Sequence, residues 1–355
     1  MASVHVVGAG PAGSAAAFEA ARAGHRVFVS EEHPCAGTPV DCSGLISKKG
    51  LDSLSDIAGY RKHVLNPIRG SEIDCAGHTI RVSSKSPAAF VVDRGGFDAA
   101  LAESAESEGA EIFFNERVNG NFRAENIIGA DGPLSQVASH FSFPCIKRYA
   151  CTMRAFTKHS EKPDSVKVFL SNRKFPGFFG WLIPHNEEKA EVGVGTVLPN
   201  NPREAFSFLL SALGAKSTTK PRAFLIPLKP RRATFRKSGK TKVMLAGDAA
   251  GQVKSISGGG VVFGTSCARI AGNCIETPEE YEKRWKAFYG KELSLHHSTH
   301  LSYSLLNDWS IRQVGRLLSF LSADRFLSEH GDMDKPTSLL TPELLTNPLR
   351  SLISK

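Results

Sequence analysis

The first thirty-one residues constrain the fold of this chain most strongly, because they follow the order strand, glycine loop, helix, strand and acid. A short apolar strand over 4–7 leads into Gly8, Gly10 and Gly13, and an alanine-rich helix follows. In this pattern the first glycine allows a tight turn, the second admits a pyrophosphate, and the third lets the helix pack closely on the strand. Glu31 follows the next strand, where an acid can bind ribose hydroxyls. The segment predicts a Rossmann-type unit that binds a dinucleotide; a glycine turn without a ligand is the alternative.

A second nucleotide-binding pattern lies more than two hundred residues later, over 242–273. An apolar strand over 243–246 runs into Asp248, and three consecutive glycines at 258–260 then open a helix. An aspartate at the end of a strand can accept hydrogen bonds from sugar hydroxyls, and glycines at a helix start leave N–H groups open to a ligand. One extended cofactor that contacts both ends of the chain would explain the two patterns together.

Two smaller signals lie between these patterns. Arg94 and Asp98 precede a predicted helix over 99–108, and a strand ends in Asp131 and Gly132. Each has an ordinary explanation, because Asp98 can be a helix N-cap and the Asp-Gly pair a plain turn. Their order between the two glycine patterns favours a role in the same cofactor site.

The four motifs, in their order along the chain, resemble the FAD-dependent oxidoreductases of the para-hydroxybenzoate hydroxylase type. They are GAGPAG at 8–13, the segment 94–98, GADG at 129–132 and GDAAG at 247–251. The resemblance implies FAD as the cofactor and an α/β fold. In that fold a Rossmann-type FAD-binding domain carries an inserted antiparallel-sheet substrate domain and a helical C-terminal region.

Two segments resemble the geranylgeranyl reductases within this group, and the archaeal digeranylgeranylglycerophospholipid reductases most of all. They are VDCSGLIS at 40–47 and GDAAGQVK at 247–254 followed by the three glycines. The resemblance implies an enzyme that saturates C=C bonds of geranylgeranyl chains in archaeal-type membrane glycerophospholipids or a related prenyl substrate. The FAD-binding residues that it implies are Gly8, Gly10, Ala12, Gly13, Glu31, Cys42, Ser43, Gly44, Arg94, Val118, Asp131, Asp248, Gly258, Gly259, Gly260 and Val261.

Two positions are candidates for the chemistry itself. Cys42 lies in a glycine-rich loop shortly after Glu31 and matches a functionally important cysteine of geranylgeranyl reductases; a small buried residue is the alternative. Phe179 and Trp181 match an aromatic-x-Trp-x-Phe-Pro segment that in this family is thought to position the prenyl chain, with Ile183 in place of the usual phenylalanine. Core packing of a strand is the alternative for these aromatic residues.

The patterns predict a discontinuous domain organisation. Residues 1–64, 91–144 and 236–290 form the FAD-binding domain, 65–90 and 145–235 the substrate sheet, and 291–355 a C-terminal helical region. Helical periodicity is present over 278–291 and 301–321, and more weakly over 342–352.

Composition and charge limit the function classes. Net charge is +9 with a pI of about 9.2, yet basic residues are dispersed apart from 229–242 and the last fifty residues, which argues against nucleic acid as a partner. An anionic membrane surface or a phosphorylated lipid headgroup fits this charge better, and solvated surface charge is the alternative. The seven cysteines form no CxxC pair, and no metal site is suggested.

The same features predict a cytoplasmic protein with peripheral contact at the inner face of the cell membrane. No apolar run reaches the roughly twenty residues that span a bilayer, and the chain starts directly in a strand, without a signal peptide. A helix over 309–321 carries Arg312 and Arg316 beside leucines and a phenylalanine, so it is a candidate for a membrane interface or a tunnel cap. Core packing with solvated arginines is the alternative.

Other functions and the electron donor are left open by the sequence. A flavin monooxygenase or halogenase is the second hypothesis, because 179–184 partly matches the halogenase pattern Trp-x-Trp-x-Ile-Pro, although its first tryptophan is missing. A non-catalytic FAD-bound protein is the third. No second GxGxxG-plus-acid unit is present, so a small redox protein, a docked reduced nicotinamide or a deazaflavin is expected to deliver the electrons.

Overall fold

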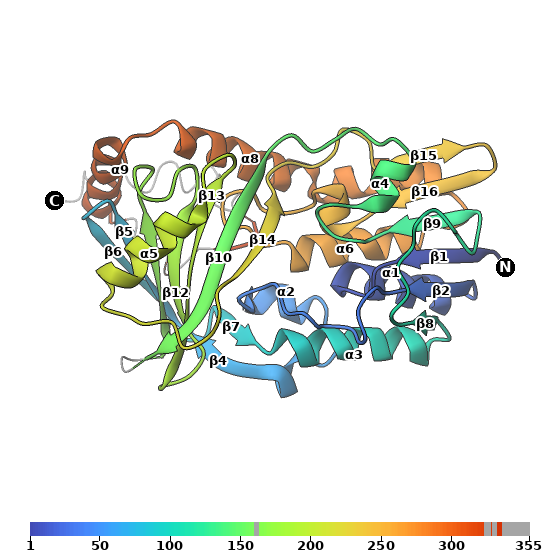
Figure 1. Ribbon diagram of the computed structural model, residues 1–355, viewed down its shortest axis with the longest axis horizontal. Helices are drawn as coiled ribbons and strands as arrows, with labels where there is room; N and C mark the ends of the chain where they lie inside the picture. Colours follow the sequence, from blue (N-terminus) through green and yellow to red (C-terminus); the bar gives the residue numbers. More distant parts are fainter. Residues whose placement is uncertain (160–162, 323–327, 329–331, 336–355) are drawn as a thin grey trace, which may run out of the picture.

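Two large sheets follow one another along the long axis of the molecule, as Figure 1 shows for the computed structural model. The structure describes residues 1–159, 163–322, 328 and 332–335. A six-stranded sheet lies at the end that carries the N-terminus, and a seven-stranded sheet lies at the other end (Figure 1).

The amino-terminal segment folds as predicted, into β1 (Ser3–Val7), α1 (Pro11–Arg22) and β2 (Arg26–Ser30). β1 and β2 are parallel, with Val4 opposite Val27. The glycine loop is tight because a Cβ on Gly13 would lie 1.8 Å from the carbonyl oxygen of Gly8, a separation that no side chain permits. The Rossmann-type unit predicted from the fingerprint is therefore confirmed.

The six-stranded sheet has the order β15-β16-β9-β1-β2-β8 and is parallel except for the β15–β16 pair. Its helix α1 packs against both α3 (Arg94–Ser107) and α6, and small residues allow the close approach: Gly272 of α6 approaches the Ala16 carbonyl of α1. The further elements of this part are β8 (Glu111–Phe113), β9 (Asn126–Gly129), α4 (Gln136–His140), β15 (Phe235–Ser238), β16 (Thr241–Leu245) and α6 (Val261–Gly272).

The seven-stranded sheet has the order β14-β10-β13-β12-β11-β5-β6. It is antiparallel, as predicted, except that β11 and β5 are parallel. One face packs on helix α5 through an apolar cluster that includes Phe175, Val192 and Phe206. Its elements are β5 (Gly70–Cys75), β6 (Thr79–Ser83), β10 (Tyr149–Lys158), β11 (Ser165–Leu170), β12 (Phe179–Pro184), β13 (Lys189–Val197), α5 (Pro202–Ala212) and β14 (Arg222–Pro227).

A three-stranded sheet of order β3-β7-β4 lies between the large sheets and leads into α3, where one prediction fails. The helix begins at Arg94 rather than at residue 99, and its N-cap is Asp93, whose carboxylate accepts from the Gly95 amide. Gly96 lies within the helix and lets the His63 ring pack closely, since a Cβ there would lie 2.7 Å from His63 Nδ1. The elements are β3 (Leu45–Ser47), α2 (Lys48–Asp52), β4 (Val64–Ile68), β7 (Ala89–Val92) and α3 (Arg94–Ser107).

The C-terminal part is helical, as expected, but the pattern over 301–321 is interrupted. α7 (Tyr281–Trp285) continues through a π-helical stretch (Lys286–Gly290) into α8 (Lys291–Ser304), and α9 (Asp308–Phe320) starts afresh. The break is set by Asn307, whose side chain accepts from the Ser310 amide and caps α9. The predicted helix over 342–352 lies outside the described residues, and no described helix is long and apolar enough to cross a membrane.

We propose that the chain is divided as its sequence predicts. The strands of the six-stranded sheet come from 3–30, 111–129 and 235–245, whereas those of the seven-stranded sheet come from 70–83 and 149–227. This distribution supports a discontinuous FAD-binding part with an inserted substrate sheet.

Candidate functional site

The start of α1 is open to an anionic ligand. Gly10 is the N-cap, no side chain caps the helix, and its first turn carries no acid. A Cβ on Gly10 would have no atom within 4 Å, so the space beside this loop is free. Free N–H groups and the positive end of the helix dipole favour a phosphate at such a place. The loop therefore fits the pyrophosphate of FAD.

The two predicted nucleotide patterns meet at Gly247. A Cβ on this glycine would lie 2.8 Å from Cβ of Ala12, and one on Gly264 of α6 would lie 3.0 Å from Cα of Gly247. Glu31 lies on the other side of the glycine loop, where its carboxylate accepts from the Ala9 amide at 2.7 Å and from the His33 amide at 3.0 Å. Its role toward ribose hydroxyls stays a prediction, although its position beside the loop fits it.

Asp248 is the best evidence in the structure for a polar ligand at the start of α6. A Cβ on Gly260 would lie 2.9 Å from Asp248 Oδ1, so the carboxyl group adjoins the three glycines. No described residue forms a hydrogen bond with this carboxyl group. Burial raises the pKa of Asp248 to about 6, and the charge of Arg94 opposes that shift. A half-buried carboxyl group without a protein partner is left open to a ligand, and hydroxyl groups of the FAD ribityl chain would satisfy it.

Arg94 connects three of the predicted residues. Its buried guanidinium forms two hydrogen bonds with Asp98, at 2.8 and 2.7 Å. Burial opposes its charge, but Asp98 and the neighbouring Cys42 raise its pKa. Arg94 also acts electrostatically on Asp248. The structure thus brings Arg94, Cys42 and Asp248 together from three distant segments.

The loop over 37–44 that carries Cys42, here called the Cys42 loop, is fixed on both sides. Gly44 packs on β7, since a Cβ there would lie 2.3 Å from the Val92 carbonyl oxygen, and its amide donates to Cys42 Sγ at 3.4 Å. On the sheet side, Arg154 donates to the carbonyl of Val40. Cys42 is therefore held between the start of α3 and the seven-stranded sheet.

The aromatic residues of β12 belong to an apolar cluster on the sheet face opposite α5, here called the inner cluster. Trp181 and Ile183 are buried in it, Phe179 packs against it, and Leu45, which follows the Cys42 loop, joins it. The Phe179 ring stacks on Phe178 with centroids 4.4 Å apart. Core packing is thus part of their role, and the cluster also forms an apolar wall beside the Cys42 loop.

Sequence reasoning missed four residues that shape this wall. On β13, a Cβ at Gly193 would lie 2.3 Å from the Trp181 ring, and one at Gly195 would lie 2.2 Å from the Phe178 ring. Glu191 accepts from Trp181 Nε1 at 3.0 Å and pairs with Arg154. The sequence did offer one signal for them: two glycines of the same strand are separated by a single residue, and glycine in a strand often marks the close approach of another group.

Two predicted FAD residues have other contacts in the structure. The carboxylate of Asp131 accepts from Ser135 Oγ at 2.6 Å and from the Val137 amide at 3.0 Å, so it stabilises the start of α4. Its backbone nevertheless adjoins the glycine loop, because a Cβ on Gly8 would lie 3.3 Å from Cα of Asp131. Val118 is buried in a separate apolar cluster with Val7 and Val137. Any contact of Asp131 with FAD is therefore expected from its backbone.

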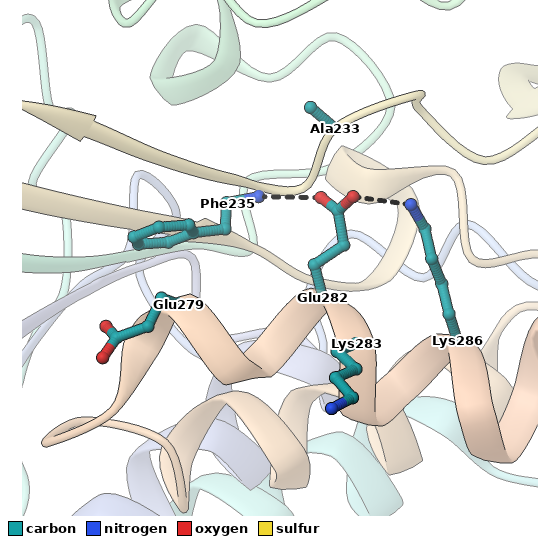
Figure 2. A pocket seen from close by; sticks show the side chains of 6 residues that line it. All are labelled: Ala233, Phe235, Glu279, Glu282, Lys283 and Lys286. Atoms are coloured by element: carbon teal, nitrogen blue, oxygen red, sulfur yellow. Dashed lines mark hydrogen bonds and ion pairs between the residues drawn. The ribbon is translucent and has the colours of Figure 1, made fainter.

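A pocket between β15 and α7 contains none of the predicted site residues. Figure 2 shows Glu282 at its centre, accepting from the Phe235 amide at 3.3 Å and from Lys286 Nζ at 2.5 Å. The remaining lining residues are Ala233, Glu279 and Lys283. Because the carboxylate of Glu282 is satisfied by its neighbours, we assign this pocket no chemistry.

The site and its relatives together identify the class of protein. Residues 3–131 match the family model for FAD dependent oxidoreductases, and together with the relatives below this match makes the chain an FAD-dependent oxidoreductase. It is 31% identical to geranylgeranyl diphosphate reductase of Rhodobacter capsulatus over 75% of this chain and 73% of the relative. It is 29% identical to digeranylgeranylglycerophospholipid reductase of Methanosarcina acetivorans over 82% of both chains. The chain belongs to the geranylgeranyl reductase family.

Solved structures confirm the predicted fold class. A geranylgeranyl bacteriochlorophyll reductase-like protein from Thermoplasma acidophilum superposes with a TM-score of 0.80 at 20% identity, covering 99% of this chain and 98% of the other. A flavin-dependent brominase superposes with a TM-score of 0.70 at 15% identity over 99% of both chains. At these identities the likeness extends to the fold alone, so it does not favour halogenation.

Proposed function

We propose that this protein uses FAD to saturate C=C bonds of geranylgeranyl chains carried by a membrane glycerophospholipid or a related prenyl lipid. One observation supports it above all: Leu45, which directly follows the Cys42 loop, joins the same apolar cluster as Phe179 and Trp181, and Cys42 itself neighbours Arg94. An apolar wall beside a cofactor site suits a hydrocarbon substrate.

Each part of this site has a role in the proposed reaction. FAD, when bound in its reduced form, supplies a hydride. An isolated trisubstituted alkene accepts hydride poorly, so a proton must be added to it as well, which gives the alkene carbocation character. Phe179 and Trp181 would exclude water that traps such a cation and stabilise it through their ring faces. We assign the proton to Cys42 Sγ, which Arg94 and the Gly44 amide hold in place.

The reaction provides the first prediction. Dithionite-reduced enzyme incubated with a digeranylgeranyl glycerophospholipid should give products heavier by about two mass units for each double bond, one hydride and one proton. Cys42→Ser should retain FAD and lower the rate by about a hundredfold or more, the range typical for loss of a general acid. Mass spectrometry of the lipid provides the measurement.

The matched control is Cys35→Ser, because Cys35 is exposed and belongs to no predicted part of the site. It should react at the wild-type rate. Oxygenated or halogenated lipid as the sole product would overturn the proposal, and equal rates for the two variants would remove the role of Cys42.

We propose a transiently docked electron donor, either a small redox protein or a reduced nicotinamide or deazaflavin. Among the described residues, β1–α1–β2 is the one unit in which a glycine loop joins two parallel strands and an acid follows. A resident nicotinamide would need a second unit of this kind.

We further propose a peripheral position at the inner face of the cell membrane, with α9 as the contact. Its inner side is packed, since Ile311 is buried and a Cβ on Gly315 would lie 2.7 Å from Cβ of Cys75. Its outer side exposes Trp309 at 69% and Phe320 at 74%, beside Arg316. Aromatic side chains together with a cation suit the headgroup region of an anionic bilayer.

The second prediction tests this surface. Trp309→Ser/Phe320→Ser should reduce sedimentation with phosphatidylglycerol-containing vesicles by about tenfold, as expected for the loss of buried aromatic area. Phe288→Ser is the matched control, because Phe288 is 69% exposed but lies on the π-helical stretch before α8. Equal vesicle binding by both variants, or none by the wild type, would exclude α9 as the membrane contact.

A further inference from the structure

We propose that Arg154 and Glu191 are positioning residues that fix the Cys42 loop and the Trp181 indole relative to each other. The inference rests on the proposed function of the same site. Arg154 lies on β10 and Glu191 on β13, the neighbouring strand, and their side chains are 8% and 0% exposed. Arg154, Gly193 and Trp181 are direct cross-strand neighbours, so they share the inner face of the sheet.

Glu191 shares its carboxylate between two elements. One oxygen accepts from Arg154 Nη1 at 2.5 Å, and the other accepts from Trp181 Nε1 at 3.0 Å. Burial raises the pKa of Glu191, while Arg154 and Trp181 favour its charged form. In a low-dielectric interior both contacts are directional and strong, so the orientation of the indole depends on the position of the guanidinium.

Arg154 carries this connection to the Cys42 loop. Its Nη2 donates to the carbonyl of Val40, two residues before Cys42. Two other residues on the sheet side lie at the same loop: Arg222 pairs with Asp41 at 2.9 Å, and His185, which follows β12, is close to the Ser43 backbone. Only Arg154 among these three is joined to Trp181 through a shared carboxylate.

The pair is not explained by stability alone. A buried ion pair is often no more stabilising than apolar residues of the same volume, although removing one partner is strongly destabilising. Arg154 Nε also has no hydrogen-bond partner among the described residues, so the guanidinium is not fully satisfied by the fold. The Arg154–Glu191 pair instead connects the Cys42 loop with Trp181, part of the wall that would hold the alkene.

Two variants separate positioning from stability. Arg154→Lys keeps the charge beside Glu191 but cannot present two forked N–H groups, so it should release Val40. Arg154→Met/Glu191→Leu removes both charges and leaves none unpaired. Arg222→Gln is the control, because it removes an exposed contact to the same loop.

The readout is the rate of Cys42 alkylation by iodoacetamide in the FAD-loaded enzyme, measured by peptide mass spectrometry. The exposed Cys35 and Cys145 serve as internal references. Both test variants should raise Cys42 alkylation about fivefold over these references and lower kcat about tenfold, since small displacements at a reacting group have effects of that size. FAD content of the double variant should stay near wild type, while its melting temperature should fall by a few degrees because the buried Trp181 Nε1 loses its acceptor. Arg222→Gln should change none of these values.

Wild-type alkylation ratios and kcat in Arg154→Lys would overturn the proposal, and this variant decides the question if the double variant does not fold. The alkylation readout needs no lipid substrate. If the wild type reduces no alkene, the proposed function is contradicted. The alkylation of Cys42 would still test whether Arg154 and Glu191 position the Cys42 loop.

Discussion

Replacing Gly13 with alanine is expected to prevent the amino-terminal unit from folding, whereas the same change at Gly10 should leave the fold intact and release FAD. The added Cβ at residue 13 would lie 1.8 Å from the Gly8 carbonyl oxygen and 2.8 Å from its carbon. Both obstacles are backbone atoms, so no rotamer change can relieve them. We expect a cost above about 4 kcal/mol, which is exceptional for one substitution and a large part of the stability of a domain.

At Gly10, by contrast, an added side chain would meet no protein atom. Its φ of −69° suits any residue, and its Cβ would have no neighbour within 4 Å. The methyl group would instead occupy the space beside the α1 N-terminus that the pyrophosphate must enter. We expect FAD affinity to fall by at least about tenfold, or 1.4 kcal/mol.

Expression yield, the melting temperature of the FAD-free protein and flavin titration provide the measurements. Gly24→Ala is unsuitable as a control because Gly24 has a φ of +81°, but Gly59→Ala has both an open Cβ position and an ordinary φ. Gly59→Ala should match the wild type in all three measurements. Normal FAD binding by Gly10→Ala would exclude the α1 N-terminus as the pyrophosphate site.

The fold features that could be predicted are those fixed by local chemistry. The glycine loop, the strands on either side of α1 and the start of α6 follow from backbone requirements at single residues, and all lie where the sequence predicts them. The start of α3 could not be chosen correctly, because Asp93 and Asp98 are equally good caps before an apolar pattern. The parallel pairing of β11 with β5 joins residues about ninety positions apart in the chain, which no local pattern specifies.

The site was predictable only as far as its motifs extend. Asp248, Arg94 and Cys42 were each predicted from residue order and family resemblance, but that Arg94 is a neighbour of both other residues becomes evident only when three segments meet in space. Arg154 and Glu191 were missed because a charged residue in an alternating strand usually marks the solvent face. Here that face is covered by the Cys42 loop, so tertiary structure reverses the usual reading of the pattern.

Replacing Asp248 with asparagine should stabilise the FAD-free protein near neutral pH and at the same time weaken FAD binding. Burial is the main cause that raises the pKa of Asp248 from 3.8 to about 6. The folded state therefore holds this proton more tightly than the unfolded chain does. The protonated Asp248 carboxyl group therefore stabilises the folded state fully below about pH 4, and this stabilisation is lost as the pH rises through 6.

Near pH 7 the charged Asp248 carboxylate thus lowers the free energy of unfolding of the FAD-free protein by at most about 3 kcal/mol. The uncharged amide of Asp248→Asn avoids this loss. Asp248→Asn should raise the melting temperature at pH 7, and the difference should vanish near pH 4. FAD affinity should fall by about tenfold or more, because a hydrogen bond to a charged acceptor is stronger than one to an amide.

Thermal unfolding of the FAD-free protein across this pH range, together with flavin titration, tests both effects. The control is Asp52→Asn, since Asp52 forms a surface ion pair with Lys48 on α2 and its pKa is lowered rather than raised, chiefly by that contact. Its stabilising contribution should be present above the ordinary aspartate pKa and be lost on acidification, the reverse of Asp248, with FAD binding unchanged. A variant at residue 248 that binds FAD normally and gains no stability at pH 7 would show that this carboxyl group is neither strained by burial nor held for the cofactor.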